Sequence, residues 1–72
     1  MNGTVKFYSG KHGYGFITGE DEKDYFVHRS AVQNYKYLKK KAQVTFDLGE
    51  RDGRVLAVNV NVTEMPQKMQ QN

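Results

Sequence analysis

The sequence predicts an all-β fold, a closed or nearly closed barrel of five antiparallel strands in one domain. Short runs rich in β-branched and aromatic residues alternate with turn-forming residues along the chain, and no segment has the pattern of a long helix. The chain has 72 residues, which is enough for one small core only. Five short strands joined by turns favour a barrel, because closing the sheet removes its exposed edges.

The first three strands are expected at residues 3–9, 14–18 and 24–28, which are rich in aromatic and β-branched residues. The first strand stops at Ser9-Gly10, and the polar turn Gly19–Lys23 connects the second strand to the third. This short turn predicts that the second and third strands pair as an antiparallel hairpin.

A polar connection is expected between the third and fourth strands. Residues 30–33 can form a single helical turn with Ser30 as its N-cap, and a long polar loop follows from Asn34 to Lys41. The fourth strand is expected at Gln43–Leu48.

The Asp52-Gly53 pair is a strong hairpin signal between the fourth strand and a fifth at Arg54–Val62. The residues that follow have too little apolar content to fold alone. We therefore expect the domain to span residues 1–63 and residues 64–72 to form a flexible tail.

Composition excludes several classes of protein. The chain has no cysteine, so neither a disulfide nor a thiolate–metal site can stabilise it. Its N-terminus enters the strand pattern directly, and no apolar run approaches the roughly 18 residues needed to span a bilayer. We expect a soluble, cytoplasmic protein without a membrane partner.

Charge is distributed unevenly, although the net charge is only +3. Four lysines occur within residues 36–41, whereas four of the eight acidic residues occur within residues 20–24. Such a separation predicts one positive and one negative end, a field that favours an anionic partner approaching from one side. Two solvated loops would explain the same pattern.

Aromatic residues are concentrated in the first half of the chain, and all of them except Phe46 precede residue 38. Because side chains alternate across a strand, Tyr14 and Phe16 share one face, and in the next strand Phe26 and His28 do the same. The hairpin places these two pairs side by side on the outer surface. The opposite faces supply three expected core residues: Ile17, Tyr25 and Val27.

An exposed cluster of flat side chains needs a function. Nucleic-acid bases provide one, because base–aromatic stacking is worth about 1–3 kcal/mol per base and tolerates any sequence. The glycines beside these rings leave room for a base to lie flat. The alternative is a second hydrophobic layer, covered by the loop at residues 34–41 or by another subunit.

Two segments, Lys11–Ile17 (KHGYGFI) and Tyr25–His28 (YFVH), resemble the two ribonucleoprotein motifs of the cold-shock domain family. The resemblance covers residues 2–62, because it extends through three flanking segments: Asn2–Phe7, Ser30–Gln33 and Ala57–Val60. It implies an OB-type five-stranded barrel that binds single-stranded RNA or DNA. It further implies an RNA chaperone and regulator of transcription or translation in the cold-shock response.

The resemblance also implies a binding surface. On the three strands it comprises Lys6, Phe7, Tyr14, Phe16, Phe26 and His28, and in the loop Tyr35 resembles an aromatic residue that caps a stacked base. To this surface we add Lys11, His12 and Arg29. His12 stands where lysine is usual, and Arg29 stands where a further aromatic is usual and can stack or bind phosphate. Phe7 stands where the family usually has tryptophan.

Catalysis is not expected, nor is a cofactor, a metal or a small-molecule substrate. Two histidines without cysteine cannot form a convincing metal site, and the acidic turn lacks the spacing of a calcium loop. We expect a monomer whose partners are single-stranded RNA and DNA. The main alternative is a protein-interaction barrel whose aromatic groove takes a proline-rich peptide. A second is an oligomeric structural protein that buries the aromatic face.

Overall fold

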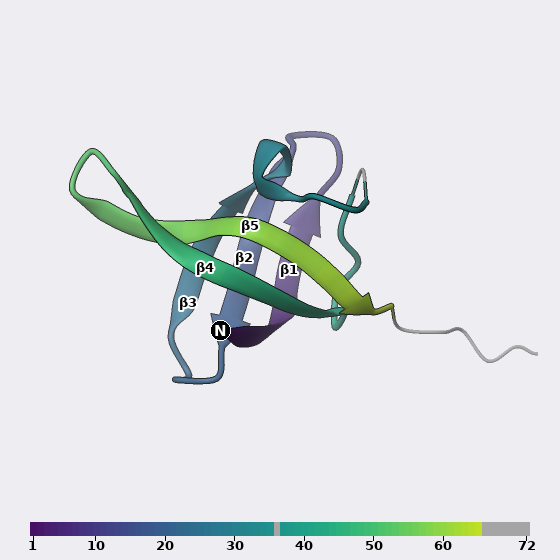
Figure 1. Ribbon diagram of the computed structural model, residues 1–72. Coiled ribbons are helices and arrows are strands. Elements are labelled where there is room, and N and C mark those ends of the chain that lie inside the picture. Colours follow the sequence, from purple (N-terminus) through teal and green to yellow (C-terminus); the bar gives the residue numbers. More distant parts are fainter. Residues whose placement is uncertain (36, 66–72) are drawn as a thin grey trace, which may run out of the picture.

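Five strands close into a barrel in the order β1-β2-β3-β5-β4 in the computed structural model, which describes residues 1–35 and 37–65 (Figure 1). The strands are β1 (Asn2–Ser9), β2 (Tyr14–Gly19), β3 (Asp24–His28), β4 (Gln43–Arg51) and β5 (Arg54–Glu64). The predicted all-β barrel is therefore confirmed. All pairings are antiparallel except that of β3 with β5, which is parallel and brings Phe26 beside Leu56.

The first three strands form a meander whose register follows the predicted hairpin. In the β2–β3 pair, Tyr14 lies opposite His28 and Phe16 lies opposite Phe26. Cross-strand partners share a face, so the two aromatic pairs are neighbours, as the alternation predicts. Val27, between Phe26 and His28, and Ile17, which follows Phe16, are both completely buried, so their side chains point inward.

A bulge in β1 changes the direction of the side chains that follow it. Val5 pairs with Ile17, but the next paired residue is Phe7, opposite Phe16, so Lys6 is the extra residue. Without the bulge, Phe7 would point into the barrel with Val5, because both have odd numbers. With it, Val5 is 1% exposed and Phe7 is 43% exposed.

The barrel core is formed by inward side chains of all five strands and by two residues of the connection before β4. Its buried members are Val5, Ile17, Tyr25, Val27, Leu38, Ala42, Val44, Phe46, Ala57, Val60 and Val62. The predicted core residues on β2 and β3 are all present. The loop at residues 34–41, predicted to be polar, also contributes to the core, because Leu38 is buried there.

The predicted helical turn is present, but its N-cap lies two residues earlier than expected. A 3-10 helix, η1, spans Arg29–Ala31, and its N-cap is His28 instead of Ser30. The imidazole of His28 accepts a hydrogen bond from the Ser30 backbone N–H. If Ser30 were the cap, this N–H would lack the imidazole as its acceptor. No helix of the described residues is long and apolar enough to cross a membrane.

The β4–β5 hairpin projects from the barrel as an arm, defined here as residues 47–56 (Figure 1). Pairing continues to Arg51 opposite Arg54, so β4 is three residues longer than predicted. Both turn residues, Asp52 and Gly53, have positive φ, as a two-residue hairpin turn requires. At its other end β5 continues to Glu64, inside the expected tail, whose residues 66–72 lie outside the described part of the chain.

Candidate nucleic-acid interface

Five rings, those of Phe7, Tyr14, Phe16, Phe26 and His28, lie on the outer surface of β1, β2 and β3, which we call the aromatic face. The centroid of Phe7 lies 6.4 Å from those of Tyr14 and Phe16. The ring centroid of Phe26 lies 5.7 Å from that of Tyr14 and 5.9 Å from that of Phe16. The four carbocyclic rings therefore form one continuous surface, and His28 adjoins it opposite Tyr14.

These rings stay partly open to solvent even though they touch one another. The exposed fraction is 36% for Tyr14 and for Phe16, 37% for Phe26 and 43% for Phe7. Within the described residues the long loop does not cover them, which argues against the alternative of a second hydrophobic layer closed by that loop. A contiguous exposed aromatic surface of this kind is typical of a binding site.

Gly15 permits this close arrangement of rings. A Cβ at Gly15 would come within 2.1 Å of the Phe7 carbonyl oxygen and 2.7 Å of the Tyr8 Cα, both backbone atoms of β1. Only glycine therefore lets β1 approach β2 here, and this approach places Phe7 beside Phe16.

Lys6, a predicted nucleic-acid-binding residue, forms an ion pair with Asp24. Its Nζ donates to Asp24 Oδ2 at 2.7 Å, and both side chains are largely exposed. This hydrogen bond and a second from the Thr18 hydroxyl lower the pKa of Asp24. Lys6 lies beside Phe7 as expected, but its charge is already offset by a carboxylate in the free protein.

The three remaining basic candidates lie near one end of β2. Lys11 and His12 are exposed on the turn between β1 and β2, and the His12 ring lies 5.9 Å from Tyr14. Arg29 reaches the same turn, because its backbone N–H donates to the Gly13 carbonyl and its side chain packs against Gly13. The structure thus brings His12 and Arg29 next to the aromatic face.

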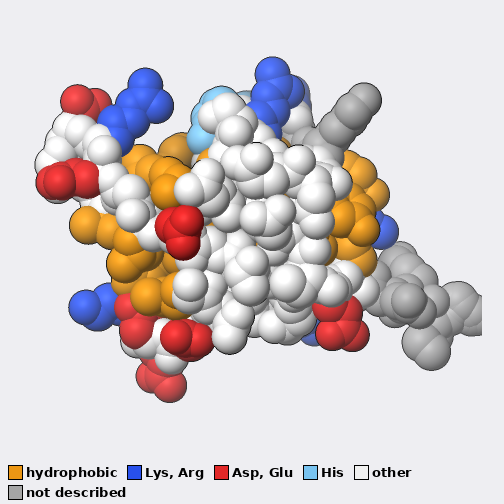
Figure 2. Space-filling view, viewed as in Figure 1, with side chains coloured by type: hydrophobic (Ala, Val, Ile, Leu, Met, Phe, Trp, Pro, Cys, Tyr) orange, Lys and Arg blue, Asp and Glu red, His pale blue; other side chains and the backbone are white. Residues whose placement is uncertain are grey.

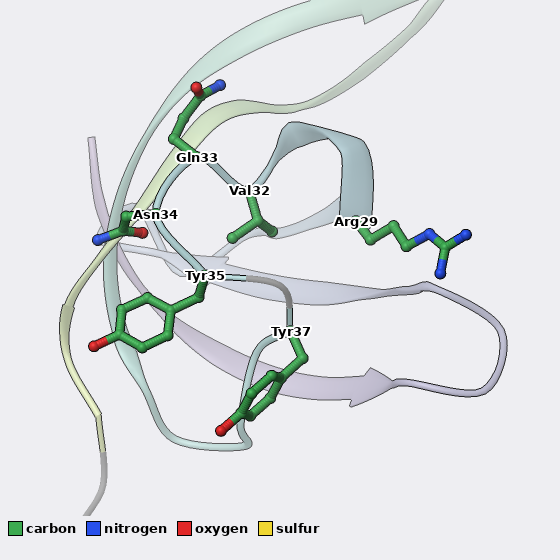
Figure 3. Close-up of a pocket in the computed structure, with 6 residues that line it drawn as sticks. All are labelled: Arg29, Val32, Gln33, Asn34, Tyr35 and Tyr37. Atoms are coloured by element: carbon green, nitrogen blue, oxygen red, sulfur yellow. The ribbon is translucent and has the colours of Figure 1, made fainter.

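A wide hollow of about 780 Å³ lies between η1 and the long loop, and we call it the loop hollow (Figure 3). It is lined by Arg29, Val32, Gln33, Asn34, Tyr35 and Tyr37. Figure 3 shows the two tyrosine rings on the same side of the loop, with Arg29 extending from the opposite end. Sequence reasoning singled out Tyr35 and missed Tyr37, although Tyr37 is more exposed, at 48%.

The long loop is held in place on both sides of these tyrosines. The Asn34 side chain donates to the Val62 carbonyl and accepts from the Val62 N–H, at 3.0 and 2.9 Å. Leu38 is buried in the core just beyond Tyr37. Tyr35 and Tyr37 are therefore presented between two anchors. The exposed lysines 39–41 follow, whereas Lys36 lies outside the described residues.

A second hollow, of about 460 Å³, separates the aromatic face from the arm, and we call it the arm groove. Its aromatic wall is Phe16 and Phe26, and its other wall carries Arg51, Arg54 and Val55. Figure 2 shows hydrophobic side chains gathered beneath the projecting arm in this region. The two arginines were missed by sequence reasoning, but arginines on both sides of an Asp-Gly turn are a recognisable signal.

Acidic side chains gather at the β2–β3 turn, as the charge pattern predicts, at the lower edge of Figure 2. One of them is engaged internally, because the Tyr25 hydroxyl donates to Asp21 at 2.5 Å. This hydrogen bond lowers the pKa of Asp21 and raises that of Tyr25. Acidic residues also occur at the tip of the arm, so the separation of charge is less complete than predicted.

Comparison with known proteins identifies relatives over nearly the whole chain. The 'Cold-shock' DNA-binding domain family matches residues 1–63. Cold shock protein 1 of Lactiplantibacillus plantarum is 51% identical over 61 residues, which cover 82% of this chain and 92% of that protein. Cold shock-like protein CspB of Bacillus cereus is 44% identical over 62 residues, or 83% and 95% of the two chains.

A third relative matches a similar share of the chain. The cold shock-like protein of Thermotoga maritima is 41% identical over 66 residues, which cover 89% of this chain and all of that protein. The region matched by the family includes β1 to β4, β5 as far as Thr63 and every ring of the aromatic face. This chain belongs to the 'Cold-shock' DNA-binding domain family.

Proposed function

We propose that this nucleic-acid-binding cold-shock protein holds single strands of RNA or DNA by stacking their bases on the aromatic face. The observation that carries the proposal is the continuous cluster of exposed rings, with neighbouring centroids 5.7–6.4 Å apart. Each stacked base contributes about 1–3 kcal/mol whatever its identity. Several rings in contact therefore support binding with low sequence preference.

The hollows on either side of the face extend the path of a strand. Beyond Phe16 and Phe26, the arm groove offers the guanidinium groups of Arg51 and Arg54 to phosphates. At the other end, Arg29 lies between the β1–β2 turn and the tyrosines of the loop hollow. Aromatic rings in the middle with arginines at both ends match the chemistry of a single strand, whose bases stack while its phosphates bind cations.

The proposed biological role is that of an RNA chaperone and regulator of transcription or translation in the cold-shock response. Binding to unpaired bases lowers the free energy of the open form of an RNA, so secondary structure opens by mass action without ATP. The protein acts as a monomer in the cytoplasm, and catalysis has no part in the proposal. Among the described residues, no group of three or more potential metal-binding side chains occurs.

A comparison of single and double strands tests the stacking mechanism. A labelled hexanucleotide and its duplex are titrated with the protein in the same salt, with fluorescence anisotropy as the readout. We expect the single strand to bind far more tightly, because bases must leave their own stack to meet the rings. Equal affinity for the two forms would leave only charge as the basis of binding and would refute the proposal.

The chaperone role needs a separate measurement. A short RNA hairpin carrying a fluorophore and a quencher is melted with and without the protein, in the absence of ATP. The melting temperature should fall as the protein concentration rises, because the protein binds only the open form. A melting temperature that stays constant, while the single strand still binds, would refute chaperone activity alone.

A further inference from the structure

His28 has two roles in the structure, as a ring of the aromatic face and as the N-cap of η1. Its Nδ1 accepts a hydrogen bond from the Ser30 backbone N–H at 3.1 Å. The Ser30 hydroxyl oxygen lies 2.9 Å from the same nitrogen. N-caps are usually serine, threonine, aspartate or asparagine, so a cap formed by an imidazole ties a surface ring to the helix that follows it.

The backbone contact determines which nitrogen of the His28 ring carries the proton. A backbone N–H can only donate, so Nδ1 must be unprotonated, and a neutral imidazole then carries its proton on Nε2. With Nδ1 unprotonated, the Ser30 hydroxyl can only be a donor in this contact, and it shares the single lone pair of Nδ1 with the backbone N–H. The lone pair of Nδ1 lies in the plane of the ring, so the same contacts fix the orientation of that plane.

We propose that Ser30 is a positioning residue, which holds His28 as a neutral Nε2–H ring in a fixed orientation before a strand arrives. The inference rests on the proposed stacking function of His28. An imidazole that rotates freely loses this freedom when a base stacks on it. Immobilising one side chain lowers affinity by roughly two- to tenfold, a loss that a ring already held by Ser30 avoids.

The surroundings of His28 indicate what the ring can recognise. A groove of about 330 Å³ is bounded by Phe26, His28 and Ser30 on one side and by the arm on the other. With Nδ1 occupied, the ring offers a bound nucleotide a hydrogen-bond donor and no acceptor. Its ligand is therefore a nucleotide that turns an acceptor atom, an oxygen or a ring nitrogen, toward the edge of His28.

Nuclear magnetic resonance tests the geometry without any ligand. In ¹⁵N-labelled protein at about pH 8, where imidazoles are largely neutral, a scalar coupling should connect the Ser30 amide nitrogen to Nδ1 of His28. His28 should show a single tautomer, whereas His12, whose ring has no hydrogen bond within the described residues, should show an average of two. A protonated Nδ1 in His28, or no coupling, would overturn the inference.

Binding of a labelled hexanucleotide tests the consequence. Ser30→Ala removes the hydroxyl contact and keeps the backbone N–H, so it should weaken binding per folded molecule by at most roughly two- to tenfold. Ser30→Thr, which retains the hydroxyl, should restore it. In a His28→Ala background, Ser30→Ala should have no further effect, because Ser30 acts through the ring. Ser9→Ala is the matched control, because it removes a serine hydroxyl that accepts the His12 backbone N–H and has no hydrogen bond with His28 among the described residues.

The outcomes separate this inference from the proposed function. If Ser30→Ala weakens binding equally with and without His28, or leaves it unchanged in the wild-type background, the positioning role is wrong and stacking on the other rings is unaffected. If His28→Ala itself leaves affinity unchanged, the stacking role of His28 fails, and with it the basis of the inference.

Discussion

Replacing Phe16 by alanine distinguishes a binding ring from a packing ring. Phe16 is 36% exposed, and its ring contacts those of Phe7 and Phe26 at centroid distances of 6.4 and 5.9 Å. Its exposed part is available to a base. The rest of the side chain already packs on the protein, so Phe16→Ala should affect binding and stability by different and separable amounts.

The two effects can be estimated from these contacts. Loss of one stacked base weakens binding by about 1–3 kcal/mol, or roughly five- to 150-fold in the dissociation constant. Loss of two aromatic pairs, each worth about 0.5–1.5 kcal/mol, destabilises the fold by about 1–3 kcal/mol. A domain of this size has a free energy of unfolding of roughly 4–11 kcal/mol, so the variant should remain folded.

Ile17→Val is the matched control, because Ile17 is the next residue of β2, points to the opposite face and is fully buried. It should destabilise the fold by about 0.5–1.5 kcal/mol and leave affinity unchanged. Urea unfolding followed by circular dichroism gives the stability of each variant. Fluorescence anisotropy of a labelled hexanucleotide, corrected for the folded fraction, gives its affinity.

Two results would refute the reasoning. Unchanged affinity per folded Phe16→Ala molecule would show that this ring packs but does not bind. Equal losses of affinity in Phe16→Ala and Ile17→Val would show that binding follows stability, and that the orientation of the side chain is irrelevant.

Further substitutions test the flanking charges. Replacing Arg51 and Arg54 together by Gln should flatten the plot of log affinity against log salt by at most about 1.4, since each phosphate contact on a single strand contributes about 0.7; an unchanged slope would place the arm off the strand. Replacing lysines 39–41 together by Gln should flatten the same plot by at most about two units without altering base preference, and parallel lines would contradict this. Because the pKa values of Asp21 and Asp24 are lowered on folding, both carboxylates stabilise the fold above about pH 3.8 and lose this effect as the pH falls below it. Urea unfolding between pH 7 and pH 3 should show that the free energy of unfolding falls with pH. If Asp21→Asn loses as much stability as the wild type over this range, Asp21 does not contribute to the effect.

Local pattern was sufficient to predict most of the barrel. Period-two alternation identified the faces of β2 and β3, since a strand buried on one side leaves its pattern directly in the sequence. Strict alternation does not hold in β1, because the bulge at Lys6 shifts the residues after it to the other face. Phe7 was assigned to the surface by family resemblance, because nothing in the local pattern marks the bulge.

Features that depend on distant contacts were harder to predict. The burial of Leu38 follows from closure of the barrel beneath the long loop, which a polar-looking segment does not reveal. The shift of the helical cap to His28 depends on a ring nitrogen acting as acceptor, a less common choice than the serine beside it. The loop hollow and the arm groove could not be predicted, because they depend on where Tyr37 and Arg51 lie relative to other elements of the fold.

The projecting arm also has a consequence for the solubility of the free protein. From Asp47 to Arg51, β4 pairs only with β5 within the described residues, so its outer edge exposes backbone groups that invite another strand. Leu48 and Val55 are about half exposed on this arm, and the charged side chains around them oppose edge-to-edge assembly. The arginines proposed to bind phosphate therefore also act as gatekeepers against aggregation. Removing them for a binding experiment should make the protein more prone to self-association, which light scattering at rising concentration would reveal.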